Sequence, residues 1–146
     1  MEINGKKVYC READARVLTA FIAGEKSDKK VSVRDHVTIR LDSSASYKLW
    51  DTELVRRNVD GSVWIYITDN SDMEHVYYGI RGRRRPVAIT QTTKNRLDTF
   101  LEYYGLNKLE AHSSKKIFGV WHNGVELKNN TWYLIDTENK NLVEIK

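Results

Sequence analysis

Apolar residues repeat every three or four positions in two parts of the chain, which is the spacing of one helix face. The first part covers residues 11–23, has acidic side chains in its first turn and is followed by Gly24, a common helix end. In the second part, Thr92 or Thr93 is the predicted N-cap and Gly105 the predicted end. The apolar face of this second helix consists of Leu97, Phe100, Leu101 and Tyr104.

Between these helices the apolar pattern changes to every second residue, the period of a half-buried strand. Residues 37–41 form the first such series, with Val37, Ile39 and Leu41 on one face. The second predicted strand continues through residues 47–57. It places Tyr47, Leu49 and Asp51 on one face and Trp50 on the other.

Residues 58–61 read Asn-Val-Asp-Gly and predict a hairpin turn, because Asp-Gly tolerates the positive φ angles of a tight turn. The returning strand, residues 63–68, is apolar enough to be covered on both faces. Residues 25–30 are predicted to form a charged loop. Further short strands are predicted at residues 76–78, 87–89, 117–121, 125–127, 131–136 and 142–145, with a short hairpin at residues 1–9.

Short connections favour antiparallel neighbours, so the predicted fold is α+β. Two helices pack on a mostly antiparallel sheet in a single compact domain, residues 1–146. Within it, residues 1–24 form the N-terminal hairpin and helix, residues 31–136 the α+β core and residues 137–146 the C-terminal strand. The composition, 40% hydrophobic and 30% charged, is that of a folded protein.

The composition also limits the compartment. The single cysteine, Cys10, excludes an internal disulfide, which fits a reducing compartment. No apolar run approaches the roughly 18 residues of a membrane span, and the first residues lack the apolar segment of a signal peptide. We therefore expect a cytoplasmic protein with no membrane partner.

Positive charge is concentrated in one stretch, residues 75–97, which holds six basic side chains and no acidic one. The whole chain has 24 basic and 20 acidic side chains, a net charge of +4. Without this stretch, 18 basic and 20 acidic side chains remain, a net charge of −2. A near-neutral domain that carries one basic segment is expected to bind an anionic partner.

The residue types in this segment suit nucleic acid. Arginine forks match phosphates, aromatic rings stack on bases, and the neighbouring glycines let a backbone approach closely. The alternative is a loop of solvated charge. The predicted binding residues of this segment are Tyr77, Tyr78, Arg81, Arg83, Arg84 and Arg85.

Two smaller basic features extend this prediction. Lys94 and Arg96 follow the second helix start, where free amides and the helix dipole can hold a phosphate. The alternative there is an ordinary N-cap with both side chains on the solvent face. Arg56 and Arg57 end a predicted strand and either extend the basic patch or are solvated.

No recognised catalytic or metal motif is present. The four histidines are scattered without metal-ligand spacing, so neither a metal nor a cofactor is predicted. A nucleophilic pair of Cys10 with a histidine stays open, because such partners meet in space rather than in sequence. The aromatic residues of the C-terminal part are expected mostly in the core, with one or two at a protein interface; they are Phe118, Trp121, Trp132 and Tyr133.

Two segments together resemble a small domain family that is common in bacteriophages and prophages. The first comprises residues 47–57 and 60–63; the second comprises residues 90–101, with its Thr-Thr-Lys-x-Arg-Leu-x-x-Phe run. Residues 131–134, Thr-Trp-Tyr-Leu, resemble the tail strand of that family, so the resemblance covers roughly residues 37–136. The arginine run 83–85, residues 108–128 and the N-terminal helix depart from the pattern. The resemblance implies a phage-type origin and no catalytic residues.

Together these features predict a small, non-enzymatic, phage-type binding protein. Its expected partner is nucleic acid, or an acidic or nucleic-acid-bound host protein. Inhibition of a CRISPR–Cas effector or of another host nuclease is one concrete form of the second case. The alternative is a hydrolase or nuclease whose catalytic residues are dispersed in the sequence.

Overall fold

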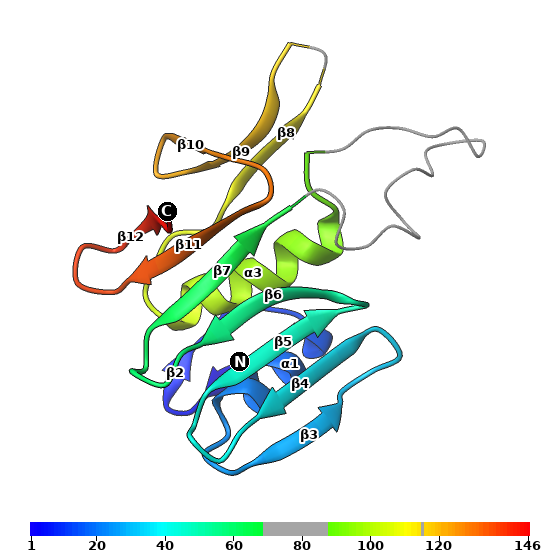
Figure 1. Ribbon diagram of the computed structural model, residues 1–146. Coiled ribbons are helices and arrows are strands. Elements are labelled where there is room, and N and C mark those ends of the chain that lie inside the picture. Colours follow the sequence, from blue (N-terminus) through cyan, green and yellow to red (C-terminus); the bar gives the residue numbers. More distant parts are fainter. Residues whose placement is uncertain (69–87, 115) are drawn as a thin grey trace.

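The computed structural model of the protein describes residues 1–68, 88–114 and 116–146. Its main element is a seven-stranded sheet in which every paired neighbour is antiparallel (Figure 1). The strands lie in the order β12, β11, β7, β6, β5, β4, β3. Their bounds are β3 Ser27–Lys30, β4 Asp35–Ile39, β5 Ala45–Leu49, β6 Thr52–Arg57, β7 Val63–Ile67, β11 Thr131–Asp136 and β12 Asn141–Glu144.

The helices α1 (Glu12–Ile22) and α3 (Gln91–Tyr103) lie behind this sheet in Figure 1. A three-stranded sheet, ordered β10, β9, β8, packs on the same side, where the backbone amide of Lys128 donates to the Tyr133 hydroxyl. A two-stranded hairpin precedes α1. The remaining bounds are β1 Glu2–Ile3, β2 Lys6–Lys7, β8 Glu110–Ser113, β9 Phe118–His122 and β10 Val125–Leu127. The α+β prediction is confirmed.

The predicted helix faces are confirmed except at Tyr104, which caps the end of α3 and is half-buried. Helix α1 buries Val17, Leu18 and Phe21 against β4 and β5. On α3, Leu97, Phe100 and Leu101 have no exposed surface. The apolar spacing of three and four residues therefore identifies the sides of both helices that face the sheet.

The predicted cap of α3 is wrong by two or three residues. The N-cap is Thr90, whose hydroxyl accepts the amide hydrogen of Thr93 at 3.2 Å. Thr93 lies inside the first turn, fully buried, and its hydroxyl hydrogen-bonds that of Thr90 at 2.8 Å. Three threonines within four residues compete for the same role, and Thr90 is the one whose backbone is extended, with φ −71° and ψ 152°. Gly105 follows α3 with φ +85°, which fits the predicted helix end.

The second predicted strand, residues 47–57, is a hairpin of two strands. Leu49 of β5 pairs with Thr52 of β6, and the two residues between them form the turn. Trp50 has φ +54°, a left-handed conformation that a continuous strand does not contain. The two turn residues are Trp50 and Asp51. Alternation alone could not show this turn, because apolar residues continue on both sides.

Three further predictions are wrong. Residues 27–30 form edge strand β3 instead of a loop, because their backbone pairs with β4. Leu41 is 83% exposed, since β4 ends at Ile39. Residues 88 and 89 are in a bend rather than a strand, although both side chains are buried. Strand β8 was not predicted, because its sequence has no apolar alternation. The predicted strand 76–78 lies outside the described residues.

A buried ion cluster joins both helices to the sheet. Arg96 of α3 donates to both carboxylate oxygens of Asp35, at 3.1 and 3.0 Å, and to Asp14 of α1. The Tyr47 hydroxyl and the Ser32 hydroxyl also donate to Asp35. Arg96, Asp14 and Asp35 are each no more than 3% exposed. Burial opposes the charge on Asp35, but its hydrogen bonds, first that of Arg96, hold its pKa below the ordinary value.

This cluster predicts loss of stability in acid. The folded-state pKa of Asp35 lies below its unfolded value of about 3.9, so its contribution is fully present above that pH. The contribution decreases as the pH falls through the folded-state pKa. We expect a shallower decrease below about pH 4 in Asp35→Asn, measured as the free energy of unfolding in urea. Equal acid slopes for wild type and variant would contradict this.

No helix of the described residues is long and apolar enough to cross a membrane.

Candidate nucleic-acid interface

The basic segment predicted from sequence cannot be placed in the structure. Tyr77, Tyr78, Arg81, Arg83, Arg84 and Arg85 lie outside the described residues. The described chain stops at Thr68, directly after β7, and resumes at Ala88, two residues before the cap of α3. These six residues therefore remain a prediction from sequence.

The structure contradicts the binding role predicted for Arg96. Its side chain is 4% exposed and paired with two aspartates, so it contacts neither solvent nor a partner. The alternative, a solvated Arg96, is wrong for the same reason. Helix periodicity explains the error: Arg96 is adjacent to Leu97 and lies toward α1 and β4, where two acidic side chains neutralise it.

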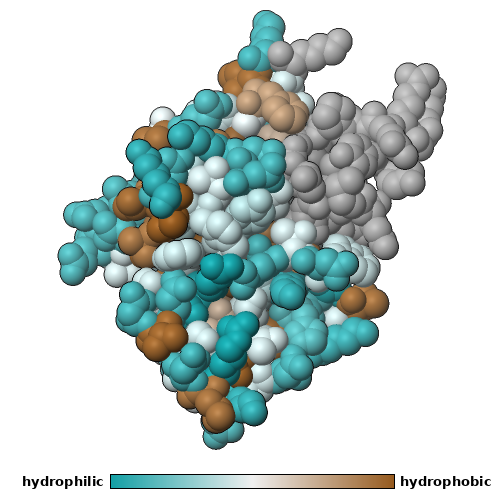
Figure 2. Space-filling view, in the orientation of Figure 1, coloured by the Kyte–Doolittle hydropathy of each residue, from teal (hydrophilic) through white to brown (hydrophobic). Residues whose placement is uncertain are grey.

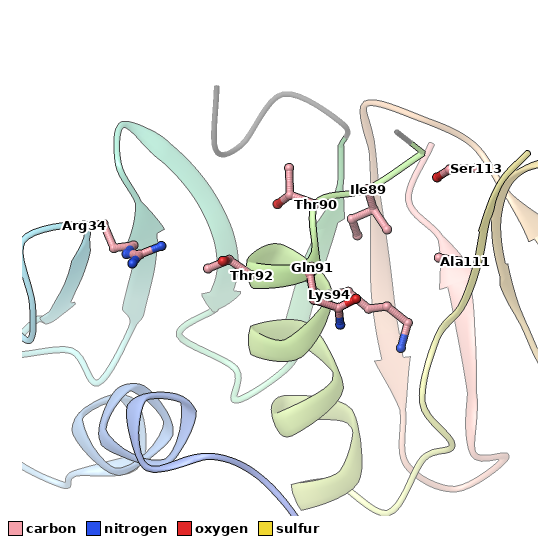
Figure 3. A pocket seen from close by; sticks show the side chains of 8 residues that line it. All are labelled: Arg34, Ile89, Thr90, Gln91, Thr92, Lys94, Ala111 and Ser113. Atoms are coloured by element: carbon pink, nitrogen blue, oxygen red, sulfur yellow. The ribbon is translucent and has the colours of Figure 1, made fainter. Parts of the chain in front are cut away.

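Lys94 lies at an opening of about 680 Å³ beside the first turn of α3. Figure 3 shows Arg34 on the opposite side of this opening from Ala111 and Ser113, with the helix start between them. The Lys94 ammonium is 2.6 Å from the carboxylate of Asp98, one turn further along the helix. Its charge is therefore already neutralised within the protein, and this opening is the weaker candidate for an anion.

A second surface was not predicted: the side of the seven-stranded sheet that faces away from the helices. Among the described residues, no helix or strand packs over this open face (Figure 1). Figure 2 shows it from the front as a mostly hydrophilic surface, with brown hydrophobic atoms mainly at its periphery. The open face is formed by every second residue of each strand, because strand side chains alternate between the two sides.

Three aromatic rings lie together on the open face. Trp64 and Tyr66 are on β7, and Trp132 is opposite Tyr66 on β11. The Trp132 ring lies 5.0 Å from that of Tyr66 and 6.4 Å from that of Trp64, centroid to centroid. All three side chains are half-buried. The cluster therefore presents aromatic surface on the second and third strands from the β12 edge of the sheet.

Arg56 of β6 connects this aromatic cluster to the charged part of the face. Its guanidinium carbon lies 4.7 Å from the ring centre of Trp132 and 5.8 Å from that of Trp64. The carboxylate of Glu53 accepts from Arg56 and from Ser46, each at 2.5 Å. Burial opposes the charge of Glu53, but these hydrogen bonds lower its pKa. Arg56 is thus fixed in place with its charge partly exposed.

A hollow of about 430 Å³ adjoins Arg56 on the open face. The exposed cations Arg40 and Lys48 line it, together with the hydroxyls of Ser44 and Ser46. Glu53 is the acidic residue of this lining. The hydroxyls of Ser44 and Ser46 already donate to the carboxylates of Asp42 and Glu53. The exposed cations of the hollow are therefore the groups that attract an oxyanion such as phosphate.

Arg57 lines the same hollow, but its guanidinium is held by groups of the protein itself. Its guanidinium donates to the backbone carbonyls of Phe21, at 3.0 Å, and Ser43, at 2.8 Å. It also lies 5.1 Å from the centre of the Phe21 ring. Alternation along β6 directs Arg56 to the open face and Arg57 toward α1. Arg57 therefore joins the end of α1 to the sheet.

The aromatic cluster contains a residue for which the sequence indicated another role. Trp132 was expected mostly in the core, yet it lies on the open face, while Tyr133 beside it is buried. Strand 63–68 was also expected to be covered on both faces, but the described residues pack against only one face of it. The signal available in the sequence was alternation of Val63, Ile65 and Ile67 with Trp64 and Tyr66.

The alternative of a nucleophilic cysteine gains no support. Burial, followed by the charge of Asp14, raises the pKa of the Cys10 thiol, which disfavours the reactive thiolate. In the described part of the chain, no three His, Cys, Asp or Glu side chains are grouped so that they could hold a metal ion.

Comparison of the chain with protein-family models, with curated proteins and with solved structures finds no match. The phage family remains a resemblance on the segments quoted above. Functional inference therefore rests on the chemistry of the open face.

Proposed function

We propose that this chain is a non-enzymatic nucleic-acid-binding protein that uses the open face of its sheet. The observation that carries the proposal is the contact of an aromatic cluster with a cationic hollow on one surface. Trp64, Tyr66 and Trp132 supply rings, and Arg56 links them to the hollow lined by Arg40 and Lys48. Nucleic acid offers both complementary groups, bases and phosphates, at a regular spacing.

The basic segment belongs to the same proposal. Residues 81–85 contain four arginines. We propose that these arginines contact phosphates in addition to Arg40, Lys48 and Arg56 of the open face. A phage-type origin, and a nucleic-acid-handling host complex such as a CRISPR–Cas effector as the site of action, are parts of the proposal that the resemblance supports.

Glu53, the carboxylate that lines the hollow, fits a binding role better than a catalytic one. A lowered pKa keeps Glu53 ionised, which does not suit a general acid. Its two carboxylate oxygens accept from Arg56 and Ser46, which does not suit a general base that must reach a substrate proton. The rival enzyme is tested by incubating labelled DNA and RNA with the protein and Mg²⁺. Cleavage that copurifies with the protein and is lost in a single Asp or His variant would support the rival.

The hollow predicts a measurable loss of phosphate binding. In Arg40→Ala/Lys48→Ala, we expect weaker binding to a labelled oligonucleotide and a smaller slope of log affinity against log salt. The slope is expected to decrease by about 1.4 to 1.8, because each phosphate contact contributes about 0.7 to 0.9. Fluorescence anisotropy between about 50 and 200 mM salt measures both quantities.

The control is Arg16→Ala/Lys128→Ala, which removes the same charge from exposed side chains away from the open face. It should leave the slope nearly unchanged. Equal effects of both double variants would mean that binding depends on the net charge of the protein and not on the position of these cations. Absence of nucleic-acid binding at low salt would contradict the proposal, and capture of a nucleic-acid-handling host complex would then favour the second predicted partner.

Arg83→Ala/Arg84→Ala tests the basic segment separately. We expect weaker binding with a nearly unchanged melting temperature. A large decrease of the melting temperature would instead give these arginines a structural role.

A further inference from the structure

We infer that the ligand of the open face is single-stranded nucleic acid, with unpaired bases stacked on the aromatic cluster. This inference rests on the proposed function and specifies its substrate class. Paired bases in a duplex expose their edges in the grooves, whereas their flat faces are covered by neighbouring bases. Aromatic rings on a sheet can use those flat faces only when the strand is unpaired.

The arrangement of the rings supports stacking. Tyr66 and Trp132 are directly cross-strand neighbours, and their ring planes are inclined by 39°. The planes of Trp64 and Trp132 are inclined by 57°. Rings that are inclined to one another, instead of forming one parallel stack, leave parts of their faces available to separate bases. All three are half-buried, so their orientation is fixed before a base arrives.

Arg56 provides a further flat group at the edge of this cluster. Its guanidinium is anchored by Glu53 at 2.5 Å and lies over Trp132. Guanidinium planes stack on unpaired bases as aromatic rings do. A strand that crosses from β11 toward β5 would therefore meet rings first, then Arg56, then the hollow with Arg40 and Lys48. Bases and phosphates of one strand are recognised on neighbouring parts of a single surface.

The shape of the surface argues against a duplex. A protein that reads duplex DNA inserts a helix or a two-stranded ribbon into the major groove. Both described helices have their apolar faces packed against the sheet, and α1 and α3 lie on the side opposite the rings. The open face is a broad sheet of seven strands, which is too wide for a groove.

The test compares three probes of about 12 nucleotides, within the site sizes of single-strand binders. The first is oligothymidine, the second an abasic strand with the same phosphates, and the third a duplex of the same length. We expect oligothymidine to bind at least about tenfold more tightly than the abasic strand, because each stacked base contributes a factor of that order or more. The duplex should bind no more tightly than the abasic strand.

The variant Trp64→Leu/Tyr66→Leu keeps apolar bulk at both positions and removes the rings. It should lose about tenfold or more in affinity for oligothymidine and almost none for the abasic strand. Trp121→Leu, on β9 of the smaller sheet, is the matched control and should change neither. Circular dichroism melting of each variant confirms that it is folded.

The outcomes separate the two proposals. If none of the probes binds, the proposed function fails and this inference with it. If all three bind equally, nucleic-acid binding stands and base stacking is overturned. Tightest binding of the duplex, or an unchanged preference for oligothymidine in the double leucine variant, also overturns the inference.

Discussion

Replacement of Arg96 by alanine is expected to lower the free energy of unfolding by about 3–5 kcal/mol. The substitution leaves the buried carboxylate of Asp35 without a cation, and that of Asp14 with only the exposed Arg11, at 3.3 Å. The cost of an uncompensated buried charge exceeds the worth of the lost hydrogen bonds themselves. Arg96→Lys should restore only part of the loss, because an ammonium cannot match the two parallel bonds to Asp35.

Urea denaturation at pH 7 measures this loss. The matched control is Arg16→Ala, which breaks an arginine–glutamate pair whose side chains are 65% and 73% exposed. An exposed pair of this kind contributes at most about 1 kcal/mol, so the control should be nearly as stable as wild type. Similar losses in both variants would mean that the buried cluster has no special importance for folding.

Replacement of Phe100 by alanine is expected to cost about 3–5 kcal/mol. Phe100 is fully buried between Phe21 of α1, at 5.0 Å with perpendicular rings, and Tyr47 of β5, at 6.0 Å with nearly parallel rings. Truncation removes both ring contacts and opens a cavity where α1, α3 and the sheet meet.

Phe118→Ala is the control for this second variant, since it makes the same chemical change at a side chain that is 48% exposed. Its cost should stay below about 1 kcal/mol. Thermal melting of both variants under identical conditions gives the comparison. A melting temperature of Phe100→Ala equal to that of Phe118→Ala would show that the layer between the helices and the sheet is packed differently.

Helices were predictable from this sequence because the apolar spacing that identifies a helix lies within the helix itself. The spacing of Leu97, Phe100 and Leu101 defines a face without any knowledge of the surroundings. The position of the cap was harder to predict, because three threonines within four residues can each fill this role. Arg96 shows the limit of local reasoning: its acidic partners are 82 and 61 residues away in sequence.

Strands were harder to predict, because pairing depends on residues elsewhere in the chain. The hairpin at Trp50 interrupts a segment that reads as one alternating strand, and β3 is charged yet pairs with β4. A polar edge strand obtains its stability from backbone hydrogen bonds, which leave no apolar pattern in the sequence.

The open face could be recognised only after the strand order was known. Trp64 and Trp132 are far apart in the chain, and no pattern within either segment relates them. The pairing of β7 with β11 brings them together, and the neighbouring β6 adds Arg56. Local charge in the sequence indicates residues 81–85, whereas the proposed interface arises from alternate positions of several strands.

The composition of β3 has a consequence for the solution behaviour of the protein. An open sheet has unpaired amides and carbonyls along both outer strands, and these can recruit a strand from another molecule. Here one outer strand reads Ser-Asp-Lys-Lys, and the other, β12, is four residues long. Lysines along an edge and short edge strands both discourage intermolecular β-pairing. The charge that made residues 25–30 look like a loop therefore protects the protein against aggregation.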